Sequence, residues 1–461
     1  MSDVVLVYPP YRNTPPGRSY SPLGLPYVAS VLENCGYSVR IVDADMERLD
    51  VGSVASVVAA ERPRLVGITV LTHALPGVLS LVESLRRLGI TNVVVGGPHI
   101  TADPQMVADL GLRYGIRGEA EYGFVKLAKY VLDGIGSEDD VEGLIVNDGG
   151  RLRAGRPCFL EDIDALPLPA RHLVRTRDYR FTVVFSSRGC PYQCLYCAEQ
   201  CRNVRFRSPD SVVDEIAGLV RDYGIRDVDF GDSVFTLDNE HVLEICRLLR
   251  ERSVRVRWNC ITRADLVDRK LLGVMKDSGC RFVSFGVESG VEDIRFAGGK
   301  RITDDAIREA FASCRQLGLR TRASILFGTP GETVADMRKS IDFVRSIRPD
   351  YALFSITQVF PGTPLFGRLL REGKAGNDVW RNFMHNKTLS LDYLPDGVTL
   401  EEAYEVSREA FRRFYLDNGY LWGKVRGVGD VYELSEAMFL VLAKLGVASL
   451  REPADEVCTN A

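Results

Sequence analysis

Three cysteines lie close together on one short segment of this 461-residue chain. Cys190, Cys194 and Cys197 have the spacing C-x3-C-x2-C, which is tight enough for one loop to hold a single cluster. Three protein ligands leave one metal position open, and open positions are typical of catalytic sites. Cys201 leaves a closed four-cysteine site as an alternative, although zinc sites usually divide their ligands into two pairs. The spacing favours a metal cluster with one open position, where chemistry can take place.

The composition describes an ordinary globular protein. Hydrophobic residues make up 46% of the chain, charged residues 26%, and the net charge is -4, which gives no reason to expect a nucleic-acid partner. No apolar run approaches the roughly 20 residues that span a bilayer. No signal peptide is recognised, so we expect a cytoplasmic protein. In that reducing compartment a cysteine cluster binds metal more often than it forms disulfides.

Residues 1–145 alternate short apolar runs with helical patterns, which is typical of a parallel α/β sheet. We therefore predict a doubly wound, Rossmann-like domain whose ligand crevice lies at the carboxyl ends of its strands. The expected strands are Val4–Tyr8, Ser38–Asp43, Leu65–Leu71, Asn92–Gly96 and Tyr114–Gly118. Ser21 is expected to cap the first helix, with Pro22 at its first position.

A linker is predicted over residues 146–178, with a hairpin-like turn at Asp148-Gly149-Gly150. A second βα series then occupies residues 179–375 and suits a partial (β/α)6 barrel. Its expected strands are Phe181–Ser186, Ile225–Gly231, Val254–Ile261, Arg281–Glu288, Arg320–Phe327 and Tyr351–Phe360. The region 376–461 is predicted to be mainly helical, with helices at 400–416 and 431–445, and to close the open edge of the barrel.

The cysteine motif resembles that of the radical S-adenosylmethionine (SAM) enzymes, in which an aromatic residue such as Tyr196 precedes the last cysteine. The resemblance implies that Cys190, Cys194 and Cys197 bind a [4Fe-4S] cluster whose fourth iron is filled by the amino and carboxylate groups of SAM. It also implies an electron donor such as flavodoxin or ferredoxin. The expected reaction begins with reductive cleavage of SAM to a 5′-deoxyadenosyl radical, which abstracts hydrogen from the substrate.

The N-terminal part resembles the cobalamin-binding domain that precedes many of these enzymes. The similar segments are Tyr8-Pro9-Pro10, Ser21–Leu25, Gly67-Ile68-Thr69, Gly96-Gly97-Pro98-His99 and Arg117-Gly118-Glu119-Ala120-Glu121. The D-x-H-x-x-G loop, whose histidine ligates cobalt in many cobalamin proteins, is missing, although many relatives bind cobalamin without it. Bound cobalamin and a domain that keeps only the fold both stay open.

Polar residues come after the predicted barrel strands at the expected active-site end. Ser284, Gly286 and Glu288 share one strand face because side chains alternate, and two small residues before a carboxylate suit the floor of a ligand site. The resemblance implies cofactor contacts for Tyr196, Gly231, Asp232, Ser233, Arg263, Glu288, Arg322 and Gln358. Asp232 as a turn cap, Glu288 as a solvated strand end and Arg263 in a surface ion pair are the alternatives.

For the reaction outcome we expect dehydration or deoxygenation of a polar small molecule, without methyl transfer, similar to aminoglycoside-pathway members of the family. Asp232 and Glu288 would orient the cofactor, and Asp229 would accept a proton from the substrate radical. Methyl transfer from cobalamin to a natural product is the alternative. A non-catalytic sensor with a closed metal site and methylthiolation of transfer RNA fit less well, since the barrel series is complete and no basic RNA-binding module is visible.

Overall fold

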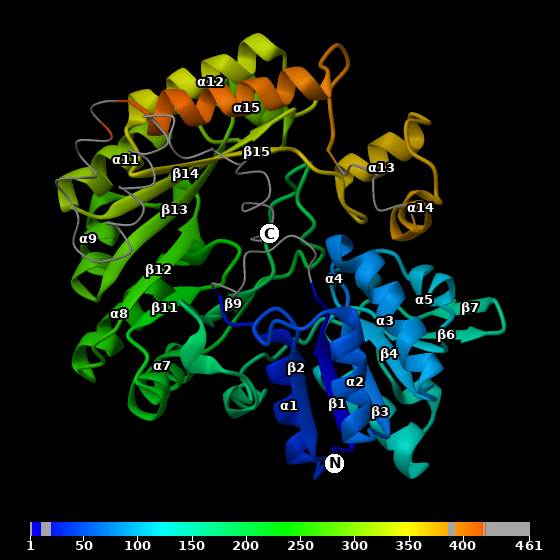
Figure 1. Cartoon of the computed structure of the whole chain (residues 1–461). Coiled ribbons are helices and arrows are strands. Elements are labelled where there is room, and N and C mark those ends of the chain that lie inside the picture. Colours follow the sequence, from blue (N-terminus) through cyan, green and yellow to red (C-terminus); the bar gives the residue numbers. More distant parts are fainter. Residues whose placement is uncertain (1, 11–19, 386–391, 418–419, 421–461) are drawn as a thin grey trace.

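The computed structural model describes residues 2–10, 20–385, 392–417 and 420 of the chain. Two α/β parts lie side by side, the first in blue and cyan and the second in green and yellow (Figure 1). The helix predicted at 431–445 lies outside the described residues. Within them, no helix is long and apolar enough to cross a membrane.

The first part is built on a seven-stranded sheet in the order β2-β1-β3-β4-β5-β6-β7. The strands are β1 (Val4–Tyr8), β2 (Val39–Asp43), β3 (Leu65–Thr69), β4 (Val93–Gly96), β5 (Tyr114–Ile116), β6 (Leu144–Asp148) and β7 (Arg151–Ala154). The first five are parallel, which confirms the predicted doubly wound sheet. The turn at 148–150 does form a hairpin, and its strands β6 and β7 extend this sheet in antiparallel pairing.

Helices cover both faces of this sheet. They are α1 (Gly24–Asn34), α2 (Val51–Glu61), α3 (Leu75–Arg87), α4 (Pro98–Ala102), α5 (Met106–Asp109) and α6 (Glu121–Ala128). One apolar core lies under α1 and α6, and another lies under α2, α3 and α5. Because both faces are covered, the strands are near-continuous apolar runs, as the sequence pattern indicates.

The second part is an open, all-parallel sheet in the order β15-β14-β13-β12-β11-β8, as predicted for a partial barrel. Its strands are β8 (Thr182–Val184), β11 (Asp227–Phe230), β12 (Arg257–Thr262), β13 (Cys280–Glu288), β14 (Arg320–Phe327) and β15 (Tyr351–Ile356). A short antiparallel pair, β9 (Ser187–Arg188) and β10 (Arg205–Phe206), flanks the cysteine segment.

The helices of the second part lie outside the curved sheet (Figure 1). They are α7 (Pro209–Tyr223), α8 (Asn239–Glu251), α9 (Arg269–Asp277), α10 (Glu292–Ala297), α11 (Asp304–Leu317) and α12 (Val334–Ile347). The core lies between helices and sheet, whereas the inner face is not filled: Ile261, in the middle of the sheet, is 40% exposed. Complete barrels pack their interior with side chains, so this lumen has room for a ligand.

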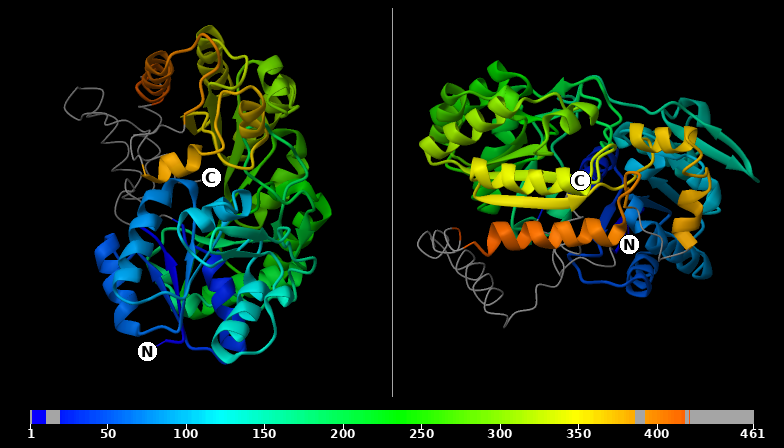
Figure 2. Two further views of the ribbon diagram at one scale, coloured as in Figure 1. Left: turned by 90° about the vertical axis from the view of Figure 1, so that its right-hand side faces the viewer. Right: turned by 90° about the horizontal axis from the view of Figure 1, so that it is seen from above.

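Both edges of the barrel sheet are covered by chain from elsewhere. Helix α15 (Leu400–Tyr415) lies along β15 (Figure 2), and the Tyr415 hydroxyl donates to the Ala352 carbonyl at 2.7 Å and accepts from its N–H at 3.1 Å. This confirms that the C-terminal region closes an open edge. At the other edge, Ser21 N donates to Phe181 O at 3.0 Å. These contacts occupy backbone groups that an open sheet edge would otherwise offer to another sheet.

Contrary to the prediction, Ser21 does not cap the first helix. Helix α1 begins at Gly24, and the Ser21 hydroxyl instead accepts a hydrogen bond from Val183 N of the barrel at 3.0 Å. A backbone N–H of an edge strand needs an acceptor when it is buried. The tertiary contact therefore takes the hydroxyl that local sequence rules assign to the helix.

Candidate active site

The three cysteines lie on the loop after β9, at the carboxyl end of the barrel sheet. Cys190 is buried and Cys194 and Cys197 are half-buried, and all three are free thiols. Burial raises the pKa of Cys190 and of Cys197, and the negative charge of the neighbouring cysteines raises both further. Closely spaced thiols with raised pKa values become thiolates only when a cation compensates their negative charge. Bound iron would supply that positive charge.

Backbone contacts hold this loop against the turn after α10. Leu195 N donates to Gly298 O at 2.9 Å, and a side chain on Gly299 would come within 2.8 Å of Gln193 O. At the start of the loop, Cys190 N donates to Cys201 O at 3.0 Å. The loop therefore keeps its shape through protein contacts, although no group of three His, Cys, Asp or Glu among the described residues is arranged around a single ion.

Cys201 is oriented away from a role as fourth ligand. Its thiol donates to Asn203 O at 3.2 Å, and Cys201 is buried. Burial raises the pKa of Cys201, and the charge of Arg205 and the hydrogen bond with Asn203 lower it. The geometry favours three ligands over four.

Glu288 ends β13 in an unusual conformation beside this loop. Its φ of 64° lies in the left-handed region, which costs a non-glycine residue energy. Its carboxylate pairs with Lys300 Nζ at 2.6 Å, and both side chains are almost buried. A Cβ on Gly286 would lie 2.2 Å from Lys300 Nζ, so the predicted small residue makes room for this pair.

Tyr196 lies close to Glu288. Burial raises the pKa of Tyr196 well above 10, and the charge of Glu288 raises it further. Its hydroxyl is buried and has no hydrogen-bond partner among the residues that the structure describes. Buried polar groups normally have a hydrogen-bond partner. The Tyr196 hydroxyl beside Glu288 therefore indicates a position at which a bound ligand would supply the missing hydrogen bond.

Asp232 comes after β11 and is fully buried. It accepts hydrogen bonds from Ser186 N at 3.0 Å, Ser186 Oγ at 2.7 Å and Ser187 Oγ at 2.6 Å. Position 231 favours glycine because a Cβ there would lie 2.7 Å from side-chain atoms of Val183 and of Phe185. These bonds hold the segment that leads into the cysteine loop; a contact between Asp232 and the cofactor stays a prediction.

Two more residues predicted to contact the cofactor lie at the mouth of the barrel, the carboxyl end of its sheet where the cysteine loop lies. Arg263 stacks over Tyr192 of the loop at 3.8 Å and binds Asp265 at 2.8 Å. Ser233 Oγ donates to Glu199 at 3.3 Å. These contacts place Arg263 and Ser233 against the cysteine segment; their contact with the cofactor stays a prediction.

Three further predicted residues lie elsewhere. Gln358 contacts His73 of the first part at 3.0 Å, so it lies at the junction of the two parts. Asp229 and Arg322 lie deeper in the lumen: register aligns Arg322 with Ser284, four residues before Glu288.

The first part binds the cysteine segment directly. Glu119 pairs with Arg205 at 2.7 Å and with Arg188 at 3.4 Å, and Glu121 pairs with Arg188 at 2.8 Å. Arg188 and Arg205 are the ends of the β9–β10 pair that encloses the loop. The Arg117–Glu121 string is visible in the sequence but its partners are not, because nothing local links residues so far apart along the chain.

The carboxyl edge of the first sheet therefore faces the cysteine loop. Gln200 Nε2, shortly after the loop, donates to Pro98 O at 3.3 Å, directly after β4. Next to it, His99 is buried, its Nδ1 lies 3.0 Å from Thr72 Oγ1, and burial lowers its pKa to about 3. The crevice of one domain and the mouth of the other thus meet at a common junction.

Two chain segments after the barrel cover this junction. Helix α13 (Pro364–Arg371) and helix α14 (Val379–His385) lie above α3, α4 and α5 in Figure 1. Trp380 of α14 packs edge-on against His99 with ring centres 5.7 Å apart. Within the described part of the chain, His99 Nε2 and Trp380 Nε1 are both buried without a hydrogen-bond partner.

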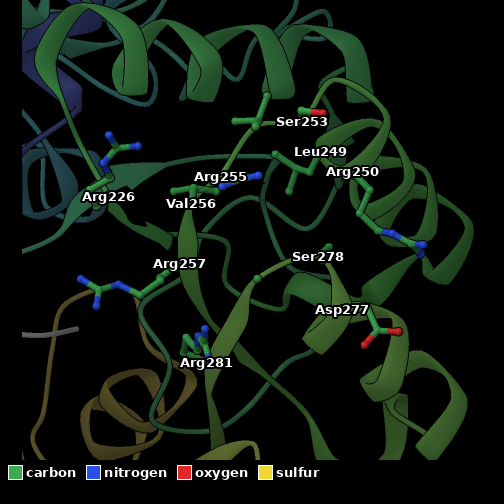
Figure 3. Close-up of a pocket in the computed structure, with 12 residues that line it drawn as sticks. Arg226, Leu249, Arg250, Ser253, Arg255, Val256, Arg257, Asp277, Ser278 and Arg281 are labelled. Carbon is green, nitrogen blue, oxygen red and sulfur yellow. The ribbon is translucent and has the colours of Figure 1, made fainter. Parts of the chain in front are cut away.

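A different hollow, of about 780 Å³, lies at the opposite, amino end of the strands. Figure 3 shows Arg226, Arg250, Arg257 and Arg281 around it, from segments that precede or begin β11, β12 and β13 or end α8. Barrel active sites lie at the carboxyl end, so this basic hollow is separate from the cysteine site.

The radical SAM superfamily model matches residues 184–344, and the B12 binding domain model matches residues 14–128. The chain therefore contains a B12-binding domain followed by a radical SAM domain, which confirms both resemblances. The radical SAM domain implies a [4Fe-4S] cluster and SAM as cofactors.

Three relatives cover most of the chain. An uncharacterised methyltransferase of Pyrococcus horikoshii is 28% identical over 90% of this chain and 92% of its own length. The anaerobic magnesium-protoporphyrin IX monomethyl ester cyclase of Cereibacter sphaeroides is 26% identical, covering 92% of this chain and 72% of its own. Cytidylyl-2-hydroxyethylphosphonate methyltransferase of Streptomyces wedmorensis is 27% identical, covering 78% and 79%.

Among solved structures, the radical SAM methyltransferase TsrM from Kitasatospora setae, with tryptophan and a SAM analogue bound, superposes with a TM-score of 0.75. The match covers 90% of this chain and 89% of that chain at 23% identity. It shows that the two chains share the whole architecture, with the domains in the same order.

Proposed function

We propose that this chain, in which a B12-binding domain precedes a radical SAM domain, is a cobalamin-dependent methyltransferase that acts on a small molecule. The expectation of dehydration without methyl transfer is wrong, because two of the three relatives described above are methyltransferases, and the third is a cyclase. A lyase is likewise not supported. Methyl transfer is the alternative that the sequence leaves open, and the relatives favour it.

One observation carries the proposal: the carboxyl edge of the B12-binding domain is bound to the segment that holds the three cysteines. Glu121 forms an ion pair with Arg188, and Glu119 forms one with Arg205. Gln200 donates a hydrogen bond to Pro98 O, shortly after the end of β4. A methyl donor in the crevice and a radical generated at the cluster would therefore act on one substrate between them. A domain that only kept the fold would need no such contact.

The residues present fit the cofactors. Three thiols on one protein-held loop suit a cluster with an open iron, and the orphaned Tyr196 hydroxyl and the Glu288–Lys300 pair suit the polar groups of SAM. At the other edge, the unpartnered His99 Nε2 and Trp380 Nε1 suit a polar ligand in the crevice. When bound, the cluster supplies the electron that cleaves SAM and cobalamin supplies the methyl group.

The protein's own contribution is positional. Asp232 holds the entry to the cysteine loop through Ser186 and Ser187, and Arg263 holds Tyr192. We propose that Glu288 and Arg263 orient SAM, and that helices α13 and α14 keep water out of the junction. An acidic flavodoxin or ferredoxin in the cytoplasm is the proposed electron donor.

The test uses anaerobically purified protein with reconstituted cluster, a chemical reductant, cobalamin and SAM carrying a deuterated methyl group. We expect 5′-deoxyadenosine together with S-adenosylhomocysteine, and a deuterated methyl group on the protein-bound cobalamin by mass spectrometry. Retention of cobalamin is measured in a separate experiment, by the visible absorption of the bound cofactor. Failure to retain cobalamin, or 5′-deoxyadenosine without S-adenosylhomocysteine, would sink the proposal.

A Cys194→Ala variant tests the cluster within the same assay, with Cys35→Ala as its matched control. Cys35 is an exposed free thiol of the first part, so its loss should leave both products unchanged. Cys194→Ala should still retain cobalamin but form no 5′-deoxyadenosine. A fully active Cys194→Ala enzyme contradicts the assignment.

A further inference from the structure

The lumen of the barrel holds polar side chains that the cysteine site does not use. Register aligns Asp229 of β11 with Asn259 of β12, and Asn259 with Phe282 of β13. Side chains alternate along a strand, and their neighbours Val228, Trp258 and Val283 are in the outer core. Asp229, Asn259 and Phe282 therefore form one row on the inner face.

Arg322 of β14 joins this row from the far side. Its guanidinium lies over the Phe282 ring at 5.9 Å, so it reaches back across β13 toward the Asn259 side. Arg322 pairs with Ser284 in register, one inward position above Phe282. At about 3.3 Å per residue, the pair of Ser284 and Arg322 lies roughly 13 Å along the strand from Glu288, which ends β13.

Neither charged group of the row has an ion-pair partner among the described residues. Asp229 Oδ2 accepts one long hydrogen bond, from Asn259 Nδ2 at 3.4 Å, and Arg322 Nε is buried with no partner. Burial raises the pKa of Asp229 to about 6, and the Arg322 charge lowers it only in part. A carboxylate and a guanidinium that share a half-buried hollow yet do not pair are costly unless a ligand satisfies them.

Tyr20, from the segment before α1, adds a hydroxyl to the same hollow. Its ring stacks on Phe181 with centres 5.3 Å apart. Burial raises the pKa of Tyr20, and the charge of Asp229 raises it further while Arg322 lowers it. Phe181 directly precedes β8, and β8 pairs with β11 so that Val183 aligns with Asp229. The stacking on Phe181 therefore places Tyr20 at the β8 edge of the sheet, beside the strand that carries Asp229. Exposed Ile261 and the rings of Phe282 and Phe181 give this hollow apolar walls.

We propose that Asp229 with Asn259, and Arg322 with Tyr20, form a subsite for a small zwitterion, the substrate class of the methyl transfer. The ammonium group would bind Asp229 and Asn259, the carboxylate would bind Arg322, and an apolar body would extend along Ile261 toward the mouth. This inference rests on the proposed function. It also replaces, for Arg322, the predicted contact with SAM, since the register puts Arg322 in the deeper layer.

The test measures binding of the 20 common L-amino acids to the reconstituted holoenzyme by saturation-transfer NMR and calorimetry. For each that binds, the N-acetyl form removes the ammonium charge and the amide removes the carboxylate. We expect at least one free amino acid to bind and both of its modified forms to bind about 10- to 100-fold more weakly, as for the loss of one charge-assisted hydrogen bond. Absence of binding by all 20 overturns the zwitterion class.

Variants assign the two ends of the ligand. Arg322→Gln should remove the preference for the free carboxylate over the amide, and Asp229→Asn the preference for the free amine over its acetylated form, whereas Arg322→Lys should keep part of the former. The controls Arg281→Gln and Asp277→Asn alter the basic hollow at the amino ends and should keep both preferences. If Arg322→Gln weakens SAM binding and leaves the amino-acid preferences intact, Arg322 is a cofactor contact and the subsite is wrong.

This experiment fails separately from the proposed function. Amino-acid binding is read without turnover, whereas methyl transfer to cobalamin is read without a second substrate. A protein that forms S-adenosylhomocysteine but binds no amino acid is a methyltransferase of another substrate class. A protein that binds the zwitterion at Asp229 and Arg322 but never methylates cobalamin keeps the subsite and loses the methyltransferase.

Discussion

Charged side chains at the mouth of the barrel, the carboxyl end where the cysteine loop lies, have protein partners. Those in the lumen beneath it do not pair with each other. At the mouth, Glu288 pairs with Lys300, Asp232 accepts three hydrogen bonds, and Arg263 is held by Asp265. In the lumen, Asp229 and Arg322 share a hollow without pairing. The difference teaches that the mouth is pre-positioned by protein contacts, as cofactor sites need, whereas the lumen leaves its charges for a ligand.

The largest expected effect comes from the loop itself. Cys197→Ala removes one of three thiolates, and we expect loss of the broad iron–sulfur absorption together with at least about a 1,000-fold loss of SAM cleavage, as for removal of an essential catalytic group. Cys158→Ala, which changes a half-buried free thiol away from the loop, is the control. Retained cleavage in Cys197→Ala would mean that the mouth is not the cofactor site.

The next effect tests how the first part supports the mouth. Glu119→Gln removes the charge that faces Arg205 and Arg188, and breaking a buried pair typically costs about 3–5 kcal/mol because the remaining charges stay buried. We expect a lower free energy of unfolding in urea and a cluster that is lost faster to a chelator. Glu142→Gln, in an exposed pair with Lys126, should change stability by less than about 1 kcal/mol.

Within the mouth, Lys300→Met leaves the Glu288 carboxylate buried beside Tyr196 without a cation. Because burial disfavours the charged form, we expect SAM to bind about 10- to 100-fold more weakly, with the cluster retained. The double variant Lys300→Met/Glu288→Gln should show a coupling between the two substitutions in a mutant cycle. Additive effects would mean that the pair does not act as a unit at the cofactor.

The smallest effect distinguishes the lumen by its pH dependence. The Asp229 pKa of about 6 lies above its usual 3.8, so the carboxylate is protonated below pH 6 and cannot attract an ammonium group. Amino-acid affinity should therefore rise about tenfold between pH 5 and pH 7 and level off above pH 7. Asp229→Asn should flatten the profile; a profile that stays steep assigns the titration to another group.

The fold could be read from the sequence to a large extent, because parallel strands covered on both faces are continuous apolar runs. The segments at Val4–Tyr8 and Arg320–Phe327 lie where the pattern predicts them. Ser21 could not be read correctly, since its hydroxyl serves a strand more than 150 residues away. Gln358 likewise lies against His73, a partner that no local pattern indicates.

The chemistry was divided in the same way. The cysteine spacing predicts a cluster with an open iron, and the matches to both domain families bear out the cofactors. The reaction outcome could not be read, because the motifs of a radical enzyme bind the cluster and SAM and do not encode the fate of the substrate radical. Similarity to methyltransferases decided against dehydration.

By itself, the sequence determined the strand series, the three-cysteine loop and the small residues at the strand ends, because each depends on neighbours within a few positions along the chain. Only the tertiary structure decided that Glu119 grips Arg205, that Lys300 neutralises Glu288, and that Asp229 and Arg322 share a hollow without pairing. Charges find or miss their partners through space, and sheet register and the docking of one domain on the other set those distances.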